Sequence, residues 1–171
     1  MHPTGLTECL EKAAQAIDWG RKAPASAPNK RRGKGLALMW KAPAMPGNAG
    51  SSAWIELAED GMLTLGVGCQ DIGQGAFTVA AQMAAAAFGV PYESVRVAMP
   101  VDTRYSPYEW QTVASRITWS TGNAIIAAGR DARQQVLELV AKAWNEKSDD
   151  LDIVNGMVIS FKSEREIAVK D

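Results

Sequence analysis

One segment constrains the fold more than any other: an apolar run, a glycine-rich turn and an alanine-rich run follow one another from Met62 to Gly89. The order strand, turn, helix gathers unpaired backbone N–H groups and the positive end of a helix dipole at one point. We therefore expect an anionic ligand there. Gly73 and Gly75 would let it approach the backbone closely, and the Gln74 amide could donate and accept hydrogen bonds. A tight connection without a ligand explains the same pattern equally well.

Length and composition indicate a globular protein. The chain has 171 residues, 47% of them hydrophobic, and a net charge of −1. We expect one domain over 1–171, with an N-terminal helix and loop over 1–32 and a sheet-and-helix core over 33–171. The balanced charge gives no reason to expect nucleic acid or an anionic membrane as a partner, and no apolar run approaches the roughly 18 residues of a membrane helix. The two cysteines form neither a disulfide framework nor a metal-site spacing, which favours a cytoplasmic protein.

The periodicity predicts an α+β fold in which an antiparallel sheet packs against two helices, one short and one long. The predicted strands are 35–40, 52–58, 62–67, 94–98 and a hairpin over 151–160 with an Asn-Gly turn; the predicted helices are 7–17 with Thr7 as N-cap, 76–87, and a long one within 112–144. Gly122 and Gly129 inside the long helix predict close backbone packing. No element is predicted after Phe161.

The residues alone supply no complete catalytic site. His2 is the only histidine and lies at the chain's start, so a histidine-based triad or metal cluster is not expected. Cys69, at a strand end, is expected to behave as a small buried hydrophobe. Five of the six tryptophans fall in predicted elements, where core packing is the default, and Trp110 lies in a loop that could face a partner.

The spacing of several motifs resembles the molybdenum hydroxylases, the family of xanthine dehydrogenase, aldehyde oxidase and carbon monoxide dehydrogenase large subunits. The resemblance covers nearly the whole chain. It rests on Gly68-x₄-Gly73-Gln74-Gly75-x₂-Thr78-x₃-Gln82, Gly89-Val90-Pro91, Asp102-Thr103, Ala114-Ser115 and Gly122-Asn123-Ala124. Gly-Gln-Gly combined with Ala-Ser at the start of the next long helix is fairly specific.

That resemblance implies a molybdopterin-binding domain. It implies that two segments bind molybdopterin with its molybdenum, often as the cytosine dinucleotide in bacteria: Gly73, Gln74 and Gly75 from the first, Ala114 and Ser115 from the second, with Thr112 nearby. It also implies hydroxylation of an aldehyde or N-heterocycle carbon, with electrons leaving through iron–sulfur and FAD subunits or domains.

The same resemblance implies a fragment. Subunits of that family are several times longer, and their glutamate base corresponds to a segment beyond Asp171. We therefore expect a piece of a larger subunit, with no catalytic residue of its own, inactive in isolation, without bound cofactor and prone to self-association. The alternative is a non-catalytic interaction module or truncated subunit whose Gly-Gln-Gly turn is purely structural. A nucleotide-binding domain is disfavoured by the glycine spacing.

Overall fold

The computed structural model describes residues 5–39 and 46–171, and the chain divides into two compact units, Met1–Met45 and Pro46–Asp171. In the first unit, helix α1 (Leu6–Ala16) starts at Gly5, which has a left-handed backbone (φ 67°) and no side-chain cap. Thr7 therefore lies inside the helix, and its prediction as N-cap is wrong. Residues 35–39 form no strand, and Trp40, the end of that predicted strand, lies outside the described residues.

The second unit begins with a three-stranded sheet in the order β1-β2-β3. Strands β1 (Ala53–Leu57) and β2 (Leu63–Val67) form the predicted antiparallel hairpin, closed by a turn in which the Gly61 N–H donates to the Ala58 carbonyl at 2.9 Å. Strand β3 (Val95–Val97) pairs with β2 in parallel. The prediction of a fully antiparallel sheet is therefore wrong at this strand. The helix between β2 and β3 carries the chain back to the end of the sheet at which β2 began, so β3 runs in the same direction as β2.

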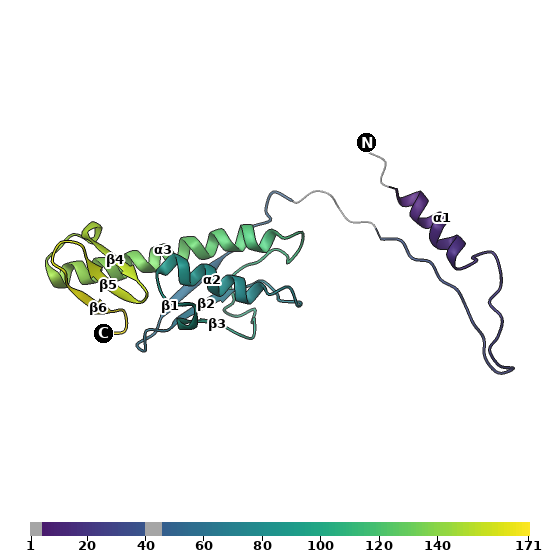
Figure 1. The fold of residues 1–171 in the computed structure, drawn as a ribbon, viewed down its shortest axis with the longest axis horizontal. Coiled ribbons are helices and arrows are strands. Elements are labelled where there is room, and N and C mark those ends of the chain that lie inside the picture. Colours follow the sequence, from purple (N-terminus) through teal and green to yellow (C-terminus); the bar gives the residue numbers. More distant parts are fainter. Residues whose placement is uncertain (1–4, 40–45) are drawn as a thin grey trace. The chain divides into compact units, whose positions relative to one another are not determined.

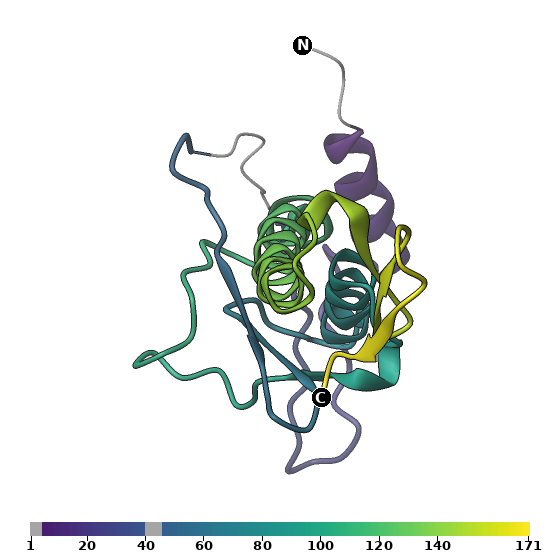
Figure 2. The ribbon, with the colours of Figure 1, turned by 90° about the vertical axis from the view of Figure 1, so that its left-hand side faces the viewer.

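That connecting helix, α2 (Ala76–Phe88), lies beside the long helix α3 (Arg116–Trp144), as Figures 1 and 2 show. Their close approach explains the two helical glycines. A Cβ at Gly129 would lie 2.7 Å from the Ala87 Cβ, and one at Gly122 would lie 2.8 Å from the Met83 Sδ. The predicted close backbone packing is confirmed at Gly129, whereas Gly122 faces the flexible end of the Met83 side chain.

A second three-stranded sheet, β4-β5-β6, closes the chain. Strands β4 (Leu151–Val154) and β5 (Met157–Ser160) form the predicted hairpin, with Asn155 and Gly156 both at positive φ, as an Asn-Gly turn of type I′ requires. Strand β6 (Glu166–Ala168), which the sequence analysis missed, pairs antiparallel with β5. Two 3₁₀ turns, Tyr92–Ser94 and Ser148–Asp150, precede β3 and β4.

Two clusters of buried side chains hold this unit together, and α3 contributes to both. Near its start, Ile125 packs with side chains of β2 and α2; near its end, Leu137 and Ala141 pack with β4 and β5. The architecture is the predicted α+β class, but with two small sheets in place of one. No helix among residues 5–39 and 46–171 is long and apolar enough to cross a membrane.

Two tryptophans depart from the expectation of core packing, whereas Trp144 packs against the buried cluster that contains Leu137 and Ala141. Trp119 on α3 is 72% exposed and Trp19 is 51% exposed, whereas Trp54 and Trp144 are half-buried. Trp119 is exposed because it lies on the side of α3 that faces neither α2 nor the sheet. Trp40 lies outside the described residues.

Candidate functional site

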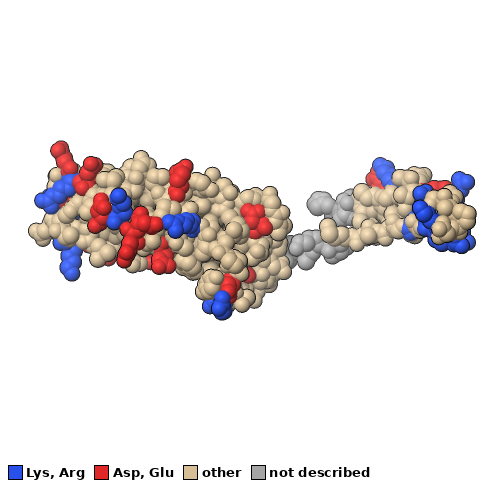
Figure 3. All heavy atoms as spheres, turned by 90° about the horizontal axis from the view of Figure 1, so that it is seen from below, with Lys and Arg blue, Asp and Glu red and all other residues tan. Residues whose placement is uncertain are grey.

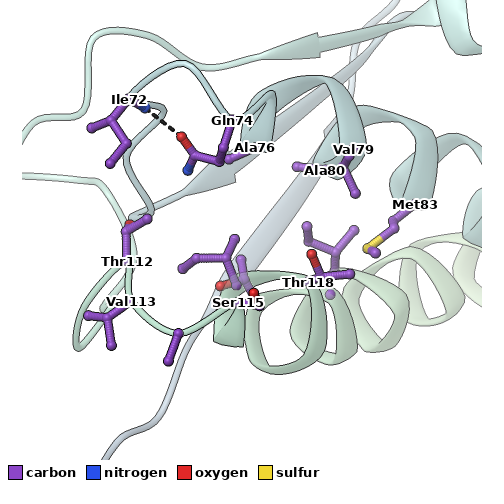
Figure 4. A pocket seen from close by; sticks show the side chains of 15 residues that line it. Ile72, Gln74, Ala76, Val79, Ala80, Met83, Thr112, Val113, Ser115 and Thr118 are labelled. Atoms are coloured by element: carbon purple, nitrogen blue, oxygen red, sulfur yellow. Dashed lines mark hydrogen bonds between the residues drawn. The ribbon is translucent and has the colours of Figure 1, made fainter. Parts of the chain in front are cut away.

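A cavity of about 420 Å³ lies between the first turns of α2 and α3 (Figure 4). Four of the six predicted cofactor-binding residues line it: Gln74, Thr112, Ala114 and Ser115. Gly73 and Gly75 are not among the lining residues. The walls are mainly apolar, and the polar residues of the lining are few: Gln74, Thr112, Ser115, Thr118 and Thr121. An apolar pocket of this size with a few polar groups is typical of small-molecule sites.

The turn before α2 differs from the prediction of open N–H groups. The carboxylate of Asp71 accepts hydrogen bonds from the backbone N–H groups of Gly73 (2.8 Å), Gly75 (3.3 Å) and Phe77 (3.3 Å). These bonds, first of all the one from Gly73, lower the pKa of Asp71. The chain's own carboxylate therefore occupies the place at the start of α2 where an external anion was expected.

The Gln74 side chain is also engaged within the turn. Its Oε1 accepts the Ile72 N–H at 2.7 Å, as Figure 4 shows, and its Nε2 donates to the Gln70 carbonyl at 2.9 Å. A glutamine amide has two N–H groups and two lone pairs on its oxygen, so one of each remains for a ligand. Gly73 and Gly75 have φ of 104° and 79°, and their missing Cβ atoms would meet nothing within 4 Å. These glycines are therefore required by the backbone of the turn itself.

The start of α3 has a different character. Ala114 and Ser115 both adopt left-handed backbone conformations, with φ of 49° and 59°, and no side chain caps the helix. The first N–H groups of a helix have no intrahelical acceptor, and here the residues at that end line the cavity. The positive end of the α3 dipole is thus the better place for an anionic group.

One hydrogen bond joins the two predicted segments. The Gln70 N–H, before the α2 turn, donates to Thr112 Oγ1, before α3, at 3.0 Å. Thr112 therefore links the two loops in addition to lining the cavity. The sequence brought these segments together only through the resemblance, because 42 residues separate the two partners.

A buried polar network behind the α3 start was missed by the sequence analysis. Arg116, 3% exposed, forms an ion pair with Glu109, whose other oxygen accepts the Thr121 hydroxyl at 2.6 Å. The guanidinium also lies over the Trp110 ring, 5.6 Å from its centre, which explains why this loop tryptophan is half-buried. No sequence motif predicts this ion pair, because Glu109 lies in a loop and Arg116 in a helix, and the two side chains meet only in the folded chain.

Other candidate groups are not arranged for catalysis. Burial, and secondarily the charge of Glu109, raises the pKa of the Cys69 thiol to about 11, so Cys69 is the inert core residue that its position predicted. Within the part of the chain that the structure describes, no three His, Cys, Asp or Glu side chains cluster as metal ligands would. Within the second unit, most of the charged side chains on the face shown in Figure 3 lie toward the β4–β6 end, and few lie near the helix starts.

Comparison with known proteins identifies the family of this domain. Residues 12–171 match the family described as the molybdopterin cofactor-binding domain. The chain belongs to this family, whose related proteins include the molybdenum-binding subunits of xanthine dehydrogenase-type oxidoreductases.

Individual relatives agree. The putative xanthine dehydrogenase molybdenum-binding subunit of Escherichia coli K12 is 28% identical over 100% of this chain, which spans 24% of that subunit. Among solved structures, quinoline 2-oxidoreductase from Pseudomonas putida 86 has a TM-score of 0.62 at 24% identity, covering 70% of this chain and 15% of its own. Carbon monoxide dehydrogenase from Oligotropha carboxidovorans has a TM-score of 0.64 at 24% identity, covering 71% and 15%. The chain therefore matches a small part of much longer proteins and shares the fold of that part.

Proposed function

We propose that this chain forms one wall of the molybdenum-cofactor site in a hydroxylating oxidoreductase of the xanthine dehydrogenase type. The observation that carries the proposal is the cavity at the uncapped start of α3, lined by Gln74, Thr112, Ala114 and Ser115. Its volume lies in the range of small-molecule pockets, its few polar groups can orient a ligand, and the uncapped start of α3 suits an anionic group.

The two helix starts would contribute differently to cofactor binding. Backbone N–H groups of the α3 start would hold the anionic part of the cofactor, and the free N–H and lone pair of Gln74 would orient it. Asp71 keeps the α2 start negative, so that end contributes shape through Gly73 and Gly75 rather than positive charge. The apolar wall from α2 and α3 excludes water. When bound, the cofactor supplies the oxygen-transfer and redox chemistry that no side chain here can supply.

The finer parts of the proposal draw on the relatives. Names such as xanthine dehydrogenase and isoquinoline 1-oxidoreductase favour an N-heterocycle as substrate, and the family resemblance adds an aldehyde as the other substrate class. We assign the cofactor as molybdopterin, with the cytosine dinucleotide as its form, iron–sulfur and FAD subunits or domains as electron partners, and a cytoplasmic location. Since the chain spans about a quarter of the matched E. coli subunit, we propose that it acts within a longer subunit and neither retains cofactor nor oxidises substrate alone. Steady-state oxidation of xanthine or an aldehyde by the purified chain would overturn this last point.

A Gln74→Ala variant of the longer subunit tests the assignment. We expect less bound molybdenum, measured by elemental analysis, together with less oxidised-pterin fluorescence per subunit. Gln134→Ala is the matched control, because Gln134 is an exposed glutamine on α3 whose amide bonds Glu138 and lies outside the cavity lining. Equal molybdenum content in both variants would refute the role of Gln74.

The second candidate is an interaction module in which the Gly-Gln-Gly turn is purely structural. The internal bonds of Gln74 and Asp71 favour it, since they satisfy the turn without a ligand. Under this alternative, Gln74→Ala lowers the stability of the turn but leaves the molybdenum content unchanged. The same measurement therefore separates the two functions.

A further inference from the structure

We propose that the buried Glu109–Arg116 pair is a positioning device that holds Ala114 and Ser115 in their left-handed conformation at the cavity. The inference rests on the proposed function, because it assigns to this pair the task of shaping the cofactor-facing turn. Neither residue lines the cavity; they act through the backbone of the loop between them.

The turn needs such a support. Two consecutive residues with side chains at positive φ are strained, and strain of this kind persists only where surrounding structure enforces it. The Ser115 side chain makes no capping bond that could stabilise the turn from within. Locally, the backbone is closed by one hydrogen bond, from the Arg116 N–H to the Val113 carbonyl at 3.0 Å.

Arg116 supplies the support from the first residue of α3. Its Nη1 donates to the Gln111 carbonyl at 2.9 Å and pairs with Glu109, so the guanidinium of the residue after the turn holds two residues that precede the turn. Its Nη2 donates to the carbonyls of Ala49 (2.6 Å) and Gly50 (3.1 Å), which anchors this assembly to the chain before β1. The separation of residue 111 from residue 116 is thereby set, and the turn must bridge it.

Two further bonds tie the assembly to the body of α3. Arg116 Nη2 donates to Ser120 Oγ at 3.0 Å, and Glu109 accepts from Thr121. The arrangement is not optimised for stability alone: both charged side chains are almost fully buried, and the Arg116 Nε is buried without a hydrogen-bond partner. Because a buried ion pair is a weak source of net stability, a conformational role explains its presence better.

Amide hydrogen exchange of this chain, resolved by NMR, tests the proposal. Two N–H groups report on the loop: that of residue 116, bonded to Val113, and that of Gln70, bonded to Thr112. We expect Arg116→Lys, which keeps the charge but loses the planar fork, to accelerate exchange at both by about tenfold. Glu109→Gln, which keeps the volume, should act in the same direction and serves where the first variant folds poorly.

The discriminating step is rescue by glycine. Adding Ala114→Gly and Ser115→Gly to Arg116→Lys relieves the left-handed strain without replacing any bond of the guanidinium. If the pair holds the turn, slow exchange returns to within about threefold of the parent chain. A merely structural network would not be rescued, because its bonds to residues 49, 50 and 120 remain lost, and that outcome would overturn the proposal.

Ile153→Val provides the control for general destabilisation, since Ile153 lies in the distant β4–β5 hairpin. It should accelerate exchange in that hairpin, which Arg116→Lys should leave unchanged; equal acceleration everywhere by Arg116→Lys would also overturn the proposal. The exchange result does not depend on cofactor. In the longer subunit, Arg116→Lys should lower the molybdenum content. If Gln74→Ala leaves molybdenum unchanged while the exchange result holds, the proposed function fails and the positioning of the turn stands.

Discussion

Thr112 Oγ1 accepts the backbone N–H of Gln70 at 3.0 Å, and this bond joins the loop before α3 to the turn before α2. Together with the packing of α2 against α3, it fixes the two walls of the cavity relative to each other. Four further residues lie between Gln70 and Gly75, and Gln74 is bonded back to the Gln70 carbonyl. The bonds of Gln70 therefore connect the glycine turn, through Gln74, to Thr112.

Replacing Thr112 with Val removes the acceptor but keeps the side-chain shape. We expect a loss of about 1 kcal/mol in the free energy of unfolding and faster exchange of the Gln70 amide, measured by urea titration and NMR. Thr112→Ser is the matched control, because it keeps the hydroxyl. A Gln70 amide that exchanges at the same rate in the Val variant would contradict the predicted link.

Gly129→Ala should destabilise the chain although alanine favours helices. The new Cβ would lie 2.7 Å from the Ala87 Cβ, and overpacking of this kind costs about 1–3 kcal/mol against a propensity gain of about 1 kcal/mol. Urea titration measures the net loss. Ala87→Gly combined with Gly129→Ala should recover part of it; strict additivity of the two changes would show that the helices do not meet there.

Asp71 should make stability depend on pH on the acidic side. Its pKa is lowered in the folded chain, first by the Gly73 N–H, so its stabilisation is fully present above the unfolded aspartate pKa of about 3.9 and is lost as the pH falls through the lower folded value. Urea titrations from pH 7 to pH 2.5 should therefore show a difference between the parent chain and Asp71→Asn that shrinks below pH 4. Using the difference removes the contributions of Asp60, Asp102 and Glu146, whose pKa values are also lowered.

The two cysteines should differ in alkylation. Cys9 is exposed, whereas Cys69 is buried with its pKa raised to about 11, so thiolate is scarce and inaccessible there. We expect iodoacetamide at pH 8 to modify Cys9 within minutes and Cys69 only after urea unfolds the chain, as followed by peptide mass spectrometry. Rapid modification of both in native buffer would show that the second unit opens near β2.

The sequence predicted the elements whose signals are local. The Asp-Gly and Asn-Gly turns, the alanine-rich helix and the two packed glycines each follow from neighbouring residues. The parallel pairing of β3 and the added strand β6 could not be predicted this way, because a three-residue strand has too little pattern and its pairing is decided by the rest of the fold.

The candidate site was also predictable only in part. Four of the six residues carried by the resemblance, Gln74, Thr112, Ala114 and Ser115, meet at one cavity, whereas Gly73 and Gly75 do not line it. What the sequence could not predict is which polar groups the chain uses for itself. In the sequence, Asp71 is indistinguishable from an ordinary turn aspartate, but in the structure its carboxylate accepts three backbone N–H groups. Glu109 and Arg116 resemble solvent-exposed charges in the sequence, but both are buried in the structure.

Helix α3 has 29 residues and so is about 44 Å long. Its first turns border the cavity, and its last turns pack against β4 and β5, where Arg133 also pairs with Asp152. The C-terminal hairpin therefore holds the far end of this long, rigid helix in place. A substitution in that hairpin would shift α3 and so displace the residues that line the cavity without altering any of them. Substitutions that impair this protein are therefore not expected around the cavity alone.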